Sequence, residues 1–128
     1  MPSIKYAHVC EYARIDSSGT VSIIGIFDTI HAPAVPVNFP FLHVVTSLTG
    51  QRGESFQFQT RLSAPDGKVL QAAPAVDIVF HQPESSTNQV NGYLGVVFPV
   101  FGVYSMEFII NGTSVHTIPF QVLPRAQR

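Results

Sequence analysis

The sequence predicts an all-β protein: one domain over residues 1–128, folded as an antiparallel β-sandwich of seven to nine strands. Apolar and polar residues alternate with a period of two in the clearest segments, and turn residues recur roughly every eight to twelve positions. Helical spacing of apolar residues is missing, and the ten Pro and nine Gly residues fall too close together for long helices.

The chain begins with a predicted hairpin. Residues 4–15 and 20–27 flank the segment 16–19, which is polar and ends in Gly, the composition of a short hairpin loop. Residues 21–27 are apolar on both faces for most of their length, which predicts a central strand and not an edge strand. The segment 31–40 contains three prolines and predicts an extended crossing from one sheet to the other.

The middle of the chain gives shorter patterns. They predict a strand at 41–49, a hairpin turn at 50–53, a tight turn at 65–67 leading into 68–72, a β-rich segment at 76–80, a polar loop at 82–88 and a strand at 90–98. Pro74 leaves open whether residues 68–81 form one strand or two.

Two segments show the strand alternation most clearly. Residues 56–62 alternate between apolar and polar side chains, which predicts a strand with one buried face. Residues 104–110 repeat the pattern and end at Asn111-Gly112, the dipeptide that best tolerates two positive φ angles. A type I′ hairpin returning through residues 115–122 is therefore expected.

The composition indicates a surface with few charges. Asp, Glu, Lys and Arg make up 12% of the chain, against about 25% in an average domain, and the seven basic and eight acidic residues nearly cancel without a run of like charges. We therefore expect neither nucleic acid nor a membrane as a partner. Charged residues interrupt the N-terminal segment, so no signal peptide is predicted, and Cys10 is the only cysteine, which suits a reducing, cytoplasmic location.

A family resemblance rests on segments near both ends. They are Cys10-Glu11-Tyr12-Ala13, the sequence IIGIFDTI at 23–30, and the run from FPVFGVYSMEF through the NG turn to IPFQV at 98–122. These resemble a family of small bacterial proteins of unknown function, whose closing hairpin is similar to the last strands of immunoglobulin-like domains. The resemblance implies an immunoglobulin-like β-sandwich from a bacterial or phage source, and it implies no catalytic residue.

No metal ion, cofactor or catalytic residue is predicted. The five histidines show no metal-ligand spacing, although four of them could converge across strands: His8, His43, His81 and His116. There is no G-x-S-x-G motif and no phosphate-binding loop, and Cys10 lies in an apolar-rich strand, which predicts a buried and inert thiol.

Asp28, His31 and Asp66 are the candidate binding residues. Asp28 and His31 lead from a predicted strand into the Pro-rich segment. If the strands alternate in direction, that segment and the turn at 65–67 lie at the same end of the sandwich, where loops on a rigid scaffold often carry function. In the alternative interpretation Asp28 forms a turn and His31 faces solvent.

For function, the sequence favours a non-catalytic interaction module that binds itself or a protein partner. A surface with few charges leaves apolar patches, which usually mark contact sites. Only Lys5 and Lys68 are available as lysines to protect strand edges, so a homo-oligomer is expected. Two alternatives stay open: a small-molecule or metal-dependent enzyme whose residues converge only in three dimensions, and a phage or particle structural protein.

Overall fold

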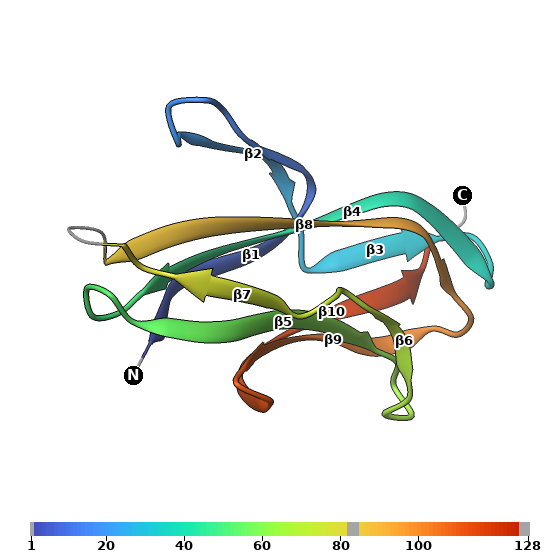
Figure 1. The fold of residues 1–128 in the computed structure, drawn as a ribbon. Helices are drawn as coiled ribbons and strands as arrows, with labels where there is room; N and C mark the ends of the chain where they lie inside the picture. Colours follow the sequence, from blue (N-terminus) through green and yellow to red (C-terminus); the bar gives the residue numbers. More distant parts are fainter. Residues whose placement is uncertain (1, 82–84, 126–128) are drawn as a thin grey trace.

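The protein is all-β, as the sequence predicts (Figure 1). The computed structural model describes residues 2–81 and 85–125, which form ten strands and no helix. The strands are β1 (Ser3–Ile15), β2 (Val21–Ile26), β3 (Thr29–Ala32), β4 (Val37–Thr49), β5 (Ser55–Ser63), β6 (Val69–Ala72), β7 (Val76–Val79), β8 (Ser86–Phe98), β9 (Gly102–Ile110) and β10 (Thr113–Pro124). Across the described ranges there is no helix that could span a membrane.

The strands form two sheets. The four-stranded sheet has the order β2-β1-β4-β8, and the six-stranded sheet has the order β3-β10-β9-β5-β6, with β7 also pairing with β5. One apolar core fills the space between them, with large side chains from both sheets, among them Leu42, Phe98, Phe58, Tyr104 and Phe120. Two sheets packed face to face around one core form the predicted β-sandwich.

The strand count is higher than the predicted seven to nine, for two reasons. The Pro-rich crossing is shorter than expected, because Thr29–Ala32 pairs in parallel with Gln121–Pro124 and only residues 33–36 cross between the sheets. Residues 68–81 form two strands, β6 and β7, which both pair with β5 on the same edge. Of the predicted loop at 82–88, residues 82–84 lie outside the described residues and Ser86 already belongs to β8.

The two clearest strand predictions are confirmed. In β5 the side chains of Phe56, Phe58 and Leu62 are buried, and in β9 those of Tyr104, Met106, Phe108 and Ile110 are buried. Between β9 and β10, Asn111 has φ 51° and Gly112 has φ 80°, as the Asn-Gly turn requires. The Asn111 side chain also accepts a hydrogen bond from the Gln57 amide at 2.9 Å, which fixes the turn against β5.

The prediction that residues 21–27 form a central strand is wrong, because β2 lies at the edge of the four-stranded sheet. The strand β1 pairs with β4 from Ser3 to Cys10 and then changes partner, pairing with β2 from Cys10 to Ile15. Residues 11–26, which we call the β1–β2 hairpin, therefore leave the plane of the sheet and project from its outer side (Figure 1).

The position of the β1–β2 hairpin explains why β2 is apolar on both faces. Val21 and Ile23 pack with Cys10, Ala13 and Val45 in a second, small cluster on the outer side of the four-stranded sheet. The other face of β2 carries Ile24 and Ile26, and these remain exposed. One apolar face therefore attaches the hairpin to the sheet, and the second apolar face is open.

Candidate functional site

The three candidate binding residues each make local contacts. Asp28 lies between β2 and β3, where its backbone carbonyl accepts a hydrogen bond from the Gln121 amide at 2.9 Å and its carboxylate accepts one from the Thr29 hydroxyl at 3.1 Å. His31 lies in β3, is exposed, and pairs with Leu123. Asp66 lies in the turn before β6, and its carboxylate accepts a hydrogen bond from the Lys68 amide at 3.0 Å. The Asp66 carboxylate thus stabilises a turn, and the Asp28 carboxylate bonds its neighbour at the bend between β2 and β3.

The register of the six-stranded sheet places these residues at one end. Ile30 pairs with Val122, and Val122 pairs with Gly102. A Cβ at position 102 would lie 2.9 Å from Cγ of Pro65, so the turn that holds Asp66 lies beside the start of β9. The intervening order β3-β10-β9-β5 spans three strand spacings, about 14 Å. The three residues are therefore spread across the width of the sheet.

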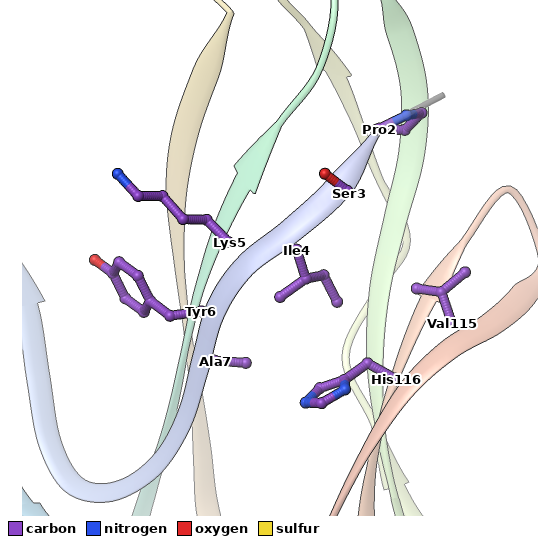
Figure 2. A pocket seen from close by; sticks show the side chains of 8 residues that line it. All are labelled: Pro2, Ser3, Ile4, Lys5, Tyr6, Ala7, Val115 and His116. Carbon is purple, nitrogen blue, oxygen red and sulfur yellow. The ribbon is translucent and has the colours of Figure 1, made fainter.

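A groove runs along the open side of the sandwich between β1 and β10. Its first part is a hollow of about 310 Å³ lined by Pro2, by residues 3–7 of β1, and by Val115 and His116 of β10. Figure 2 shows Ile4 and Ala7 pointing from β1 toward β10, whereas Lys5 and Tyr6 point the other way. The groove lies here because β1 pairs only with β4 over this stretch, as β2 has not yet joined it.

The groove continues into a second hollow of about 380 Å³ that shares Ala7 with the first. His8, Asp28 and Ile118 are among its lining residues. Both histidines have aromatic neighbours: the His8 ring stacks on Tyr6, which points away from β10 (Figure 2), with ring centroids 5.7 Å apart, and the His116 ring lies 5.4 Å from the Phe108 ring. The walls therefore combine polar and apolar surface in similar shares.

The chemistry available at these surfaces is limited. Within residues 2–81 and 85–125, no three His, Cys, Asp or Glu side chains gather in a way that could hold a metal ion. Cys10 is fully buried, as predicted, and its sulfur lies 3.5 Å from the carbonyl oxygens of Tyr12 and His43. Burial raises the pKa of the Cys10 thiol, which disfavours the reactive thiolate.

A further feature is a set of exposed apolar residues that we call the apolar corner: Tyr12, Ile24, Ile26, Phe41 and Leu94. Their exposed fractions run from 45% for Tyr12 to 66% for Leu94. Tyr12 pairs with Ile24, so these two side chains share one side of the hairpin, and Ile26, which follows the positive-φ Gly25, also lines the second hollow between β1 and β10. Phe41 and Leu94 are partners across β4 and β8.

The two parts of the apolar corner meet at His43. The Tyr12 ring lies edge-on to the His43 ring, with centroids 5.3 Å apart. Phe41 precedes His43 by two residues and lies on the same face of β4. Nδ1 of His43 donates a hydrogen bond to the Glu11 carbonyl at 3.0 Å, which holds the hairpin at this position. The hairpin forms an upright part with Tyr12, Ile24 and Ile26, and the sheet forms a flat part with Phe41 and Leu94.

A glycine shapes the upright part. Gly25 has φ 72°, and a Cβ there would lie 2.7 Å from Oε2 of Glu11, so both the backbone conformation and the space favour glycine. The Glu11 side chain therefore lies directly against the backbone of β2 at Gly25.

Sequence patterns did not single out the apolar corner. Phe41 and Leu42 are adjacent, so one of them must face away from the core in a regular strand, and the same holds for Tyr93 and Leu94. That signal marks exposed apolar residues, but the contact between Tyr12 and His43 depends on the change of partner of β1.

The fold and these surfaces define a small β-sandwich protein with an exposed apolar corner and, in its described part, no group of three or more His, Cys, Asp or Glu side chains that could hold a metal ion. The chain belongs to a family of unknown function, DUF6941, whose model matches residues 5–123. This match confirms the resemblance to a family of unknown function. None of the curated proteins matches the chain.

Proposed function

We propose that this protein is a non-catalytic interaction module that binds a protein surface, its own or that of another protein, through the apolar corner. The size of this surface carries the proposal. Its five side chains are about half to two-thirds exposed, and each leaves on the order of 100 Å² open to water, about 500 Å² together. Exposed apolar patches of about 300–600 Å² on a monomer are often functional.

The backbone of β2 supports the same proposal. β2 has one neighbour in the described sheet, β1, so its other edge is open. Its sequence VSIIGI contains neither a charged residue nor proline, the residues with which proteins usually protect an edge. The other edge strands, β3, β6 and β8, also lack charged residues and proline, but β2 differs from them in being apolar at five of its six positions when Gly25 is included. β2 is therefore suited to contact with a partner.

The enzyme alternative has weaker support. His116 lines the first hollow between β1 and β10, whereas His8 and Asp28 both line the second. A general acid–base pair needs two titratable groups within reach of the same substrate atoms. In the second hollow the His8 ring stacks on Tyr6 and the Asp28 carboxylate accepts a hydrogen bond from the Thr29 hydroxyl, so both groups already have partners.

The proposal includes an immunoglobulin-like topology for the sandwich. Tyr104, at the start of β9, donates a hydrogen bond from its hydroxyl to the Val100 carbonyl at 2.6 Å. A tyrosine whose hydroxyl bonds back to the backbone a few residues upstream, at the corner between two strands, is a feature of immunoglobulin-like domains. A bacterial source and a cytoplasmic location remain part of the proposal, with the single cysteine as support for the latter.

Site-specific photo-crosslinking in cells tests the interaction. A photoreactive phenylalanine analogue at position 24 is expected to form a covalent adduct with a protein, whether a second copy or a different chain. The matched control carries the analogue at Val115, which is also exposed but lies on the other sheet. The absence of any protein adduct at position 24, or equal adducts at both positions, would contradict the proposed function.

A further inference from the structure

We propose that the partner of the apolar corner is a second copy of this chain, bound so that the upright part of each copy packs on the flat part of the other. This inference rests on the proposed function and specifies its partner. Charge, size and shape of the apolar corner carry it.

The charge of the surface favours an uncharged partner. The strands β2, β4 and β8, which supply four of the five residues of the apolar corner, contain no Asp, Glu, Lys or Arg. The fifth residue, Tyr12, lies between Glu11 and Arg14, one charge of each sign. A strongly acidic or basic partner would find nothing to pair with, whereas a copy of the same surface matches it.

The size of the surface is sufficient for a symmetric pair. With about 500 Å² of apolar area per copy, two copies would remove on the order of 1,000 Å² from water, the lower limit for a specific interface. The polar atoms around the five side chains would add to this area. A dimer through this surface is therefore expected to be stable at micromolar concentrations and to dissociate on dilution.

The shape of the surface suits a two-fold axis. In such a dimer each residue contact occurs twice, because one self-complementary patch serves both copies. The β1–β2 hairpin projects from the body of its own domain (Figure 1), and the exposed residues Ile24 and Ile26 belong to this hairpin. Phe41 and Leu94 lie on the sheet itself and can receive them. Each copy thus has an upright part and a flat part. Around the two-fold axis, the upright part of each copy packs on the flat part of the other.

The mass of the full chain in solution tests the inference, measured by light scattering after gel filtration over a concentration series. We expect a mass of twice 14.0 kDa that falls toward one chain on dilution. Ile24→Lys and Leu94→Glu should each give a single chain, because each places a charge in an apolar contact. Both positions are more than half exposed, so circular dichroism and thermal unfolding should match the wild type.

Mixing the two variants tests the reciprocal arrangement. In a mixed dimer, Lys from one chain meets Glu from the other, and the second contact keeps the original Ile24 and Leu94. The mixture should therefore recover the double mass that neither variant shows alone. Val115→Lys, a change on an exposed residue of the other sheet, should leave the wild-type mass unaltered.

The outcomes separate this inference from the proposed function. A wild-type chain that stays at 14.0 kDa over the whole series overturns the second copy as partner. A dimer that survives both substitutions, or variants that fail to recover on mixing, overturns the reciprocal contact. If the wild type is monomeric and the photoreactive analogue at position 24 is joined to a different protein, the proposed function stands and this inference fails.

Discussion

The hydroxyl groups of Thr60 and Tyr93 lie 2.6 Å apart and share a hydrogen bond that crosses the core. Thr60 belongs to β5 in the six-stranded sheet, and Tyr93 belongs to β8 in the four-stranded sheet. Both residues are buried, and burial raises the pKa of the Tyr93 hydroxyl. Two polar groups in the apolar core thus satisfy one another and join the two sheets.

Replacing Tyr93 by Phe is expected to lower the free energy of unfolding by about 1–3 kcal/mol, because the buried Thr60 hydroxyl loses its partner. Urea unfolding followed by fluorescence or circular dichroism measures this difference.

The double variant Thr60→Val with Tyr93→Phe is the control for this pair. Because it removes both polar groups while keeping their shape, it should be more stable than the sum of the two single changes predicts. Strict additivity of the two single effects would show that the two hydroxyls are not coupled.

A second prediction concerns stability in acid. Arg61 lies 2.8 Å from the Glu107 carboxylate and lowers its pKa below the ordinary 4.5, and a hydrogen bond from Ser63 acts in the same direction. In the unfolded chain the carboxyl has its ordinary pKa, so the folded state is favoured above pH 4.5 and loses this contribution as the pH falls through the lowered pKa.

The difference in stability between the wild type and Glu107→Gln should therefore shrink as the pH is lowered from neutral to below about 4.5. Unfolding midpoints in urea at a series of pH values measure it. Arg61→Gln removes the main cause of the lowered pKa and should show the same convergence with the wild type in acid. A difference that stays constant at every pH would contradict this role for Glu107.

A third prediction concerns the turn between β9 and β10. Gly112 has φ 80°, and a side chain with a branched Cβ is strained in this conformation. Gly112→Val should lower the free energy of unfolding by more than about 1 kcal/mol. Gly112→Asn should be milder, because Asn tolerates positive φ better than Val. If both variants melt at the wild-type temperature, the strain is released by a change in the turn.

The sequence predicted the local structure well where one pattern decided it. The alternation in β5 and β9 and the Asn111-Gly112 turn depend on neighbours in the chain, and all three are confirmed. The edge position of β2 could not be predicted from its neighbours in the chain. Its two apolar faces resemble those of a central strand, and they serve instead to attach the hairpin to the sheet and to form the apolar corner.

The candidate site shows the same limit. Asp28 and Asp66 were selected because they lie in loops at one end, and the register places them there. Neither their distance across the sheet nor their local hydrogen bonds follow from spacing along the chain. The apolar corner brings together residues from β1, β2, β4 and β8, and only the pairing of these strands shows that they adjoin.

A fourth prediction is that the purified protein carries no stoichiometric transition metal. His8 and His116 lie in separate hollows, and each ring packs against an aromatic neighbour. Elemental analysis of untagged protein, purified without chelator, measures the metal content per chain. One equivalent of zinc or another transition metal would favour the enzyme alternative over the interaction module.

The last prediction uses Cys10 as a probe of the β1–β2 hairpin. Cys10 is fully buried beside Ala13 and Val45, and burial raises the pKa of its thiol. A thiol reagent should therefore react with the folded protein at least about tenfold more slowly than with the chain in urea, because reaction requires an opening of the structure.

The route of this opening can be distinguished with two variants. Ile23→Ala weakens the cluster that holds the hairpin on the sheet, whereas Val122→Ala weakens the main core. If the hairpin opens on its own, Ile23→Ala should increase the reaction rate of Cys10 by more than the loss of global stability accounts for. Val122→Ala should increase this rate only as much as its loss of global stability accounts for. Equal acceleration relative to stability in both variants would mean that Cys10 is exposed only by global unfolding. The hairpin would then be as firmly attached as the sandwich itself, and its apolar face would be presented to a partner as a rigid surface.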